Sequence, residues 1–221
     1  MLRRRRPVQL ELRASTWGGK RDGAGRPKTG RKYVPHRVRP VHKKAHPVHV
    51  TLRARVSTLR DFSVFDAVEA ALAKGSKSFF RVCEYSVQRN HIHLIVEAGD
   101  TVALSRGMQG LVARIAKAVN RAMHRRGSVF ADHYHAHELC KPTEVRNALV
   151  YVLNNWKKHL PGANRGVDGC SSGKWFLGWQ DHGPDTPSPL PAAKEWLLTQ
   201  GWRLRGLIET REKPHAEFLF D

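Results

Sequence analysis

The stretch that most constrains the fold is residues 79–98, where two apolar runs flank a short polar break. The runs "FFRVCEYSV" and "HIHLIVEA" each have the length of a strand, and the residues between them are Gln88, Arg89 and Asn90. Three residues are too few for a crossover helix, so the two strands must pair antiparallel. The sequence therefore predicts a β-hairpin, and side chains on it are held by a rigid sheet.

The segments around this hairpin complete an α+β pattern. Residues 47–56, "PVHVTLRARV", alternate apolar and polar side chains as a half-buried strand does. Helices are expected over 64–74 and 102–125, a fourth strand over 128–139 and a closing helix over 141–160. The order βαββαβ, followed by one more helix, predicts a ferredoxin-like antiparallel sheet with helices packed on it.

The charge of the chain indicates a polyanionic partner, with nucleic acid the leading candidate. There are 39 Lys and Arg against 19 Asp and Glu, which gives a net charge of +20. Residues 1–46 combine this charge with too few apolar residues to pack, so a flexible basic arm is expected there. No apolar run is long enough for a membrane helix, and no hydrophobic signal segment follows the start. We therefore expect a soluble, cytoplasmic protein with no membrane partner, whose three separated cysteines stay reduced.

Two groups of basic residues are candidates for DNA contact. The "GRPK" stretch of the arm resembles the Gly-Arg-Pro core of AT-hook peptides, whose arginine lies in the minor groove of A·T-rich DNA. Non-specific contact with phosphate is the alternative for the arm. Basic residues also recur every three or four positions along the second helix, where an exposed solvated face is the alternative. The candidates are Arg26 and Lys28 in the arm and Arg114, Lys117, Arg121 and Arg125 on the helix.

His91 and His93 are the candidate metal ligands. They lie two residues apart on a strand, so both imidazoles point to one face. A pair of histidines on a wetted sheet face is the alternative. On the closing helix, Tyr151 falls outside the apolar arc, and Asn155 shares its face one turn later. If that face meets the histidines, two imidazoles and an amide could hold a divalent cation next to a hydroxyl nucleophile.

A second group of histidines offers a rival metal site. His133, His135 and His137 alternate in "DHYHAHE", so they share one face of the fourth strand. All three come from a single strand with no obvious carboxylate to complete the set. Phosphate contacts or a solvated face are the alternatives.

The ordered motifs resemble a known superfamily. "NHIHLIVE", followed 58 residues after His93 by "YVLNN", resembles the HUH single-tyrosine endonucleases. The fuller pattern over most of residues 17–160 resembles the REP-associated tyrosine transposases, a bacterial branch of those enzymes. The resemblance implies that His91, His93 and Asn155 bind Mg²⁺ or Mn²⁺ and that Tyr151 is the nucleophile.

The same resemblance implies an activity and a domain plan. The enzyme would cut and rejoin single-stranded DNA at palindromic, REP-like hairpins through a 5′-phosphotyrosine intermediate, as a monomer or homodimer associated with the nucleoid. Residues 47–160 would form the nuclease domain, and residues 161–221 a C-terminal extension of unknown role. A non-catalytic DNA- or RNA-binding protein on the same fold is the alternative.

Overall fold

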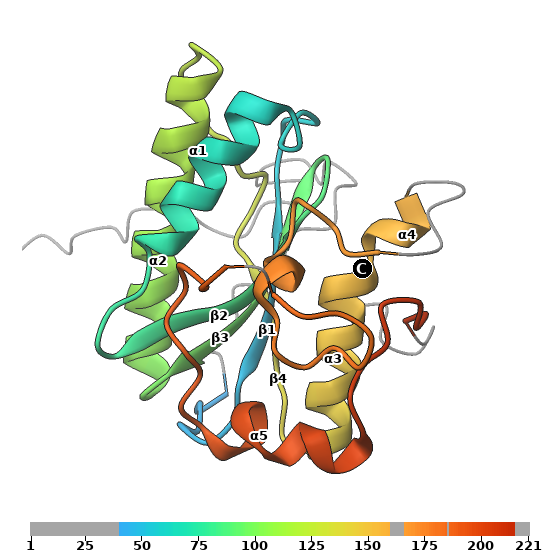
Figure 1. Cartoon of the computed structure of the whole chain (residues 1–221). Coiled ribbons are helices and arrows are strands. Elements are labelled where there is room, and N and C mark those ends of the chain that lie inside the picture. Colours follow the sequence, from blue (N-terminus) through green and yellow to red (C-terminus); the bar gives the residue numbers. More distant parts are fainter. Residues whose placement is uncertain (1–39, 160–165, 185, 215–221) are drawn as a thin grey trace, which may run out of the picture. The chain divides into compact units, whose positions relative to one another are not determined.

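The computed structural model describes residues 40–159, 166–184 and 186–214 (Figure 1). The predicted order of strands and helices is confirmed, except that the closing helix expected over 141–160 is divided after Asn154 into two helices. Three short elements in the C-terminal segment are added to this order. In chain order the elements are β1 (Val48–Arg53), α1 (Phe62–Ala73), β2 (Phe80–Val87), β3 (His91–Ala98), α2 (Thr101–Ala122), β4 (His135–Glu138), α3 (Pro142–Asn154), α4 (Trp156–His159), η1 (Ser172–Trp175), α5 (Trp196–Thr199) and η2 (Gly201–Arg205).

The four strands form one antiparallel sheet in the order β2-β3-β1-β4. This is the ferredoxin-like arrangement, so the predicted fold class is confirmed, and β2 and β3 form the expected hairpin. The register places Thr51 of β1 opposite His93 of β3 on one side and opposite His135 of β4 on the other. Side chains at paired positions share a face, so these three residues lie on the same side of the sheet.

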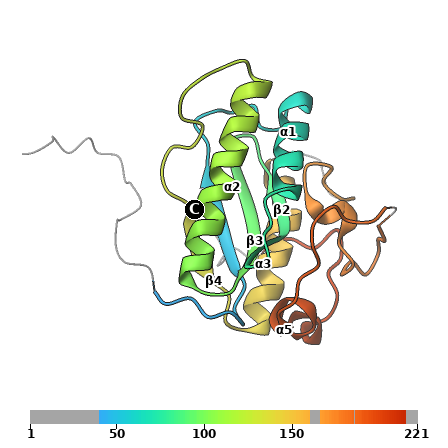
Figure 2. The same cartoon turned by 90° about the vertical axis from the view of Figure 1, so that its left-hand side faces the viewer.

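Helices cover both faces of the sheet. Figures 1 and 2 show α1 and α2 on one face and α3 on the other. Val50 and Leu52 of β1 and Leu94 of β3 belong to the core beneath α1 and α2. Gly107 allows α2 to lie close to β2, because a Cβ there would stand 2.2 Å from the Phe80 ring. The alternation of β3 then directs His91, His93 and Ile95 toward α3.

The C-terminal segment completes a second core around α3. Phe176, Trp179, Trp202 and Ile208 pack in one cluster with the apolar residues of that helix. Trp202 is 1% exposed and stacks on Phe176 with ring centroids 5.5 Å apart. Trp179 and Trp202, for which the sequence predicts no role, thus pack on α3. Tyr151 falls outside the apolar arc of α3 but is only 2% exposed, because its ring meets His49 and His93 of the sheet.

Several element ends differ from those expected. The fourth strand keeps only residues 135–138, and the segment before it contributes a single bridge from Phe130 to Ala54. Helix α2 ends at Ala122, because His124 adopts a positive φ of 48°. Arg125 therefore lies beyond the helix, and its guanidinium donates to the carbonyl of Ser128 at 3.3 Å. It does not continue the basic row of α2.

The expected basic arm is packed at its C-terminal end. His42 is 8% exposed, and its Nε2 lies 3.1 Å from the carbonyl oxygen of Ala98. Its backbone N–H donates to Thr101 Oγ1 at 2.8 Å. Residues 42–46 thus belong to the folded unit, because buried polar contacts to β3, α2 and β4 fix them. Residues 1–39, including Arg26 and Lys28, lie outside the described residues.

Candidate active site at the interface of the sheet and helix α3

Strand β3 and helix α3 bring His93, Tyr151 and Asn155 together. His93 is 1% exposed, and its ring centroid lies 5.0 Å from that of Tyr151 in an edge-on arrangement. Asn155 Nδ2 lies 3.2 Å from His93 Nε2. His91 is half-buried at the start of β3, with its ring centroid 4.8 Å from that of His93. Three of the four predicted residues are therefore buried in mutual contact, and His91 adjoins them.

Both ends of helix α3 are fixed, which fixes the residues it carries. Pro142 occupies the first turn, where its missing N–H does no harm. The Glu144 carboxylate accepts hydrogen bonds from the backbone N–H of Cys140 and of Lys141. The helix ends at Asn154, and Asn155 is its C-cap. The side chain of Asn155 therefore turns toward the sheet from the last turn of a rigid element.

The hydrogen bonds of the two histidines define their tautomers. Asn155 Nδ2 can only donate, so His93 Nε2 accepts and His93 Nδ1 carries the proton. That proton points to Thr51 Oγ1 at 3.2 Å. His91 Nδ1 lies 2.8 Å from Asn90 Oδ1, which can only accept. These contacts fit the tautomer with the lone pair on Nε2 in both rings, in which that nitrogen can ligate a metal.

His49 and Thr51 of β1 also contact the candidate site, although the sequence does not predict that they do. His49 stacks on His93 with ring centroids 5.3 Å apart and meets Tyr151 edge-on at 5.7 Å. Burial, together with the nearby His137, lowers the pKa of His49 to about 3, so its ring is neutral at physiological pH. The alternation in "VHVTLR" already placed both residues on the polar face of β1. The sequence does not show that β1 pairs with β3 in a register that sets them beside His93.

The rival set of histidines is only partly assembled. His135 and His137 lie exposed on β4, on the sheet face that carries His93. His133 precedes the strand, is exposed and lies 3.3 Å from Asp132. The described residues contain one group of three potential metal ligands whose ligand atoms all lie within 4.8 Å of one another. It consists of His46, Glu138 and Cys140.

A half-buried carboxyl group lies further along the same sheet face. Glu84 of β2 is paired with Ile95, and Ser172 Oγ donates to its Oε2 at 2.5 Å. Burial raises the pKa of Glu84 to about 8, although the Ser172 hydrogen bond acts in the opposite direction. The group is therefore mostly protonated at neutral pH. It packs under the C-terminal segment as a neutral acid.

A basic groove lies between α1 and α2, on the sheet face opposite Tyr151. It has a volume of about 670 Å³, and small side chains of both helices line it between four exposed cations. Three of the four predicted helical DNA-binding residues belong to it, while Arg125 does not. The cations are Lys74, Arg114, Lys117 and Arg121.

Comparison with known proteins places the chain in a family. The family model described as "Transposase IS200 like" matches residues 43–155, which include β1 to α3 and all four predicted site residues. The chain belongs to the IS200-like transposase family. It is thus a DNA-processing protein of the transposase type, in agreement with the resemblance seen in its sequence.

Two solved structures are similar at low identity. One is a REP-associated tyrosine transposase bound to a REP hairpin, with 17% identity and a TM-score of 0.46 over 57% of this chain and 74% of that chain. Another is a putative transposase from Deinococcus radiodurans, with 18% identity and a TM-score of 0.37 over 54% of this chain and 91% of that chain. No curated protein matches the chain. No helix among the described residues is long and apolar enough to cross a membrane.

Proposed function

We propose that the protein is a metal-dependent enzyme that cuts and rejoins single-stranded DNA, with Tyr151 as the nucleophile. The observation that carries this proposal is the contact of His93 with both Tyr151 and Asn155 in a buried site. Two rigid elements carry these groups: the aromatic hydroxyl would be the nucleophile, and the two imidazoles and the amide would be the metal ligands beside it. The family match supports chemistry on DNA.

The residues present fit a divalent cation. His91 and His93 both carry the lone pair on Nε2, and a half-turn of the Asn155 amide exchanges its Nδ2 for the ligand oxygen. Mg²⁺ or Mn²⁺ held there would polarise the scissile phosphate. Thr51 and Asn90 hold the two rings from their Nδ1 sides. The three ligands come from β3 and the end of α3, which leaves coordination positions for DNA oxygens.

The proposed step exchanges one phosphate ester for another. The Tyr151 oxygen attacks the phosphorus in line, the bond from phosphorus to the 3′ oxygen breaks, and the tyrosine proton ends on that oxygen. The products are a 5′-phosphotyrosine and a free 3′-OH. Attack by a 3′-OH on the phosphotyrosine reverses the step and restores Tyr151, so rejoining needs no external energy source.

The burial of Tyr151 adds a requirement to this mechanism. Tyr151 is only 2% exposed, so we propose that DNA binding opens the site locally to bring its hydroxyl to the strand. His91 is the most exposed of the four residues, so the strand would enter at the start of β3. Steps of this kind, in which binding opens a site, commonly limit the rate of an enzyme.

DNA binding is proposed at the groove between α1 and α2 and through the residues before 40. The groove between α1 and α2 offers four cations for backbone phosphates. The residues before 40, with Arg26 and Lys28, would add further contacts, as the sequence predicts. We propose a hairpin formed by a palindromic repeat as the substrate, residues 47–160 as the nuclease domain, and the segment after it as a cover for α3.

The decisive experiment measures a covalent adduct. The full-length protein is incubated with a single-stranded hairpin oligonucleotide and Mn²⁺, and denaturing gels show protein that migrates with the DNA. Tyr151→Phe should abolish the adduct while it keeps hairpin affinity and changes the free energy of unfolding by no more than about 1 kcal/mol. Tyr134→Phe is the matched control, because Tyr134 lies just before β4 and should leave the adduct unchanged.

A non-catalytic DNA- or RNA-binding protein is the second candidate, and the buried Tyr151 favours it. This candidate predicts hairpin binding without any adduct, even at saturating Mn²⁺. An adduct whose DNA-linked peptide contains Tyr134 would also contradict the assignment of Tyr151. The presence of an adduct in the wild type and its loss in Tyr151→Phe would exclude the second candidate.

A further inference from the structure

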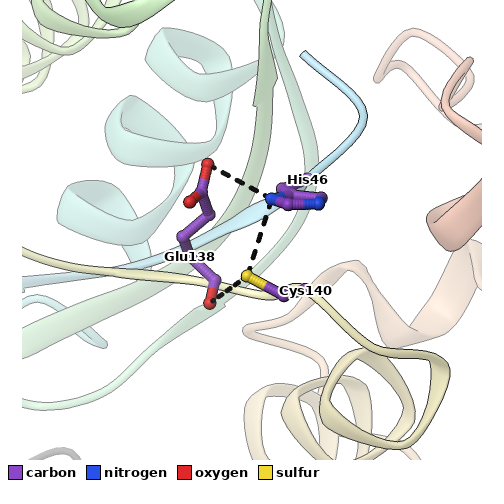
Figure 3. Close-up of side chains that lie close together, drawn as sticks. All are labelled: His46, Glu138 and Cys140. Atoms are coloured by element: carbon purple, nitrogen blue, oxygen red, sulfur yellow. Dashed lines mark hydrogen bonds and ion pairs between the residues drawn. The ribbon is translucent and has the colours of Figure 1, made fainter. Parts of the chain in front are cut away.

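A second cluster of metal-ligand side chains lies where the chain enters β1 (Figure 3). His46 precedes β1, and Glu138 and Cys140 stand at the end of β4 and just beyond it. His46 Nδ1 lies 3.5 Å from Cys140 Sγ and 3.6 Å from Glu138 Oε1. Imidazole, carboxylate and thiolate together are the ligand types that zinc takes in proteins.

The distances fit a tetrahedral ion. Zinc bonds of ~2.3 Å to sulfur and ~2.0–2.2 Å to nitrogen or oxygen place neighbouring ligand atoms ~3.4–3.6 Å apart. The two separations of 3.5 and 3.6 Å fall in this range. The separation of 3.6 Å between nitrogen and oxygen is also too long for a direct hydrogen bond. His46 and Glu138 are therefore spaced as two ligands of one ion would be.

The surrounding residues hold the ligands in place. Glu138 Oε1 lies 2.9 Å from His42 Nδ1 and accepts the backbone N–H of Lys43 at 2.9 Å. The backbone N–H of His46 donates to the carbonyl of Lys43 at 2.9 Å, which closes a turn. Imidazole and backbone groups that orient a ligating carboxylate are a usual feature of metal sites. The cluster is thus fixed by contacts from outside it.

This cluster is separate from the site of Tyr151. Val48 and Glu138 are paired at one end of the sheet, whereas His91 pairs with Arg53 at the other. Thr51, which pairs with His93, is three positions from Val48, which corresponds to roughly 10 Å along β1. Glu138 also points to the sheet face opposite His137 and His93, because side chains alternate along β4. A metal here would not touch the proposed nucleophile.

We propose that His46, Glu138 and Cys140 bind one zinc ion, with water as the fourth ligand, and that this ion fastens the chain ahead of β1 to the connection between β4 and α3. The thiolate selects zinc over the Mg²⁺ or Mn²⁺ proposed beside Tyr151. The ion would hold the folded end of the basic N-terminal segment in a fixed position on the sheet. Binding at this site does not depend on the proposed nuclease activity.

Cobalt substitution tests the thiolate ligand directly. Full-length protein titrated with Co²⁺ should show the thiolate-to-cobalt charge-transfer band in the near ultraviolet, which the sulfur-free site at His91 and His93 cannot produce. Cys140→Ser should abolish the band, and His46→Ala should weaken zinc affinity at least tenfold. The control variants Cys170→Ser and His182→Ala change residues outside the cluster. They should leave the charge-transfer band and the zinc affinity unchanged. A band that is absent from the wild type, or that survives in Cys140→Ser, would overturn the proposal.

A second measurement uses the wild-type chain alone and so does not depend on any variant folding. Cys140 is exposed, and its alkylation by iodoacetamide can be followed by mass spectrometry of its peptide. Saturating Zn²⁺ should slow this alkylation at least tenfold and leave the rate at Cys170 unchanged. Equal rates at Cys140 with and without Zn²⁺ would contradict the proposal.

Discussion

The ring of His93 is held on three sides, and each contact has a different origin in the sequence. Asn155 reaches it from α3, Thr51 from β1, and His49 stacks on its face. The partners on α3 follow from helical spacing and could be anticipated. The partners on β1 depend on strand register, which no local pattern specifies.

Thr51 is predicted to orient His93 for metal binding. Thr51→Val removes the acceptor for the His93 Nδ1 proton while it keeps the shape of the side chain, so the affinity for Mn²⁺ should fall roughly 10–100-fold. Thr51→Ser keeps the hydroxyl and should restore most of that affinity. Isothermal titration with Mn²⁺ measures both. Equal losses in the two variants would mean that packing, rather than the hydroxyl, matters at this position.

Glu84 is predicted to make stability fall as pH rises. Its pKa is about 8 in the folded state and near 4.5 when unfolded, so between these values only the unfolded chain gives up the proton. With respect to this group, the free energy of unfolding is therefore highest below pH 4.5. It falls progressively as the pH rises to about 8. Glu84→Gln removes the effect and should stabilise the protein on the order of 3 kcal/mol at pH 7, and by less than about 1 kcal/mol at pH 5.

Urea unfolding at the two pH values measures this difference. The matched control is Asp66→Asn, which changes an exposed carboxylate on α1. The control should show similar stability changes at both pH values. A Glu84→Gln effect that does not depend on pH would show that the carboxyl group is not protonated in the folded state.

At the scale of elements, alternation and helical periodicity predicted the order of strands and helices, and the ends were less predictable. His124 in a left-handed conformation ends α2 before Arg125, whereas the glycine that predicts the stop is Gly127, three residues later. Strand β4 is short because only residues 135–138 pair continuously with β1. Such ends depend on tertiary contacts, whereas the interiors depend on local pattern.

The groove between α1 and α2 is predicted to bind the DNA backbone. Replacing Arg114, Lys117 and Arg121 together by Ala should lower hairpin affinity and reduce the slope of log affinity against log salt by roughly 2 to 3. Adduct formation at saturating DNA should change little, because the groove and Tyr151 lie on opposite faces of the sheet. Fluorescence anisotropy over a range of salt concentrations gives the slope.

A control with the same change in charge separates the groove from net charge. The exposed residues Arg205, Arg211 and Lys213 lie in the C-terminal segment, and replacing them by Ala also removes three cations. This control should leave the slope nearly unchanged. An equal reduction in both triple variants would mean that the protein binds DNA through its overall charge alone.

At the scale of the whole described structure, the C-terminal segment and the sheet form one core around α3. The sequence does not predict this arrangement, because "WFLGW" and "WLLTQGWRL" lack a hydrophobic periodicity that would indicate what they pack against. The structure shows Phe176, Trp179 and Trp202 packed in one cluster with the apolar residues of α3 and with Ile95 of the sheet. The buried state of Tyr151 is therefore a property of the assembled fold rather than of its own helix.

Trp202 is predicted to stabilise this core. Trp202→Ala should lower the free energy of unfolding by about 3–5 kcal/mol, because a fully buried aromatic side chain is lost. Trp196→Ala is the matched control, since Trp196 is 55% exposed, and it should change stability by less than about 1 kcal/mol. Equal effects of the two replacements would contradict this role.

The cover of α3 also has a consequence for synthesis of the protein. The residues that shield this helix lie up to position 208, more than fifty residues after its end at Asn154. At about 5–20 residues per second, a ribosome needs roughly 3–11 s to add them. During that interval the nascent chain presents the apolar side of α3 without its final partner. The growing polypeptide should therefore bind chaperones most strongly in this window, before residues up to Ile208 have emerged.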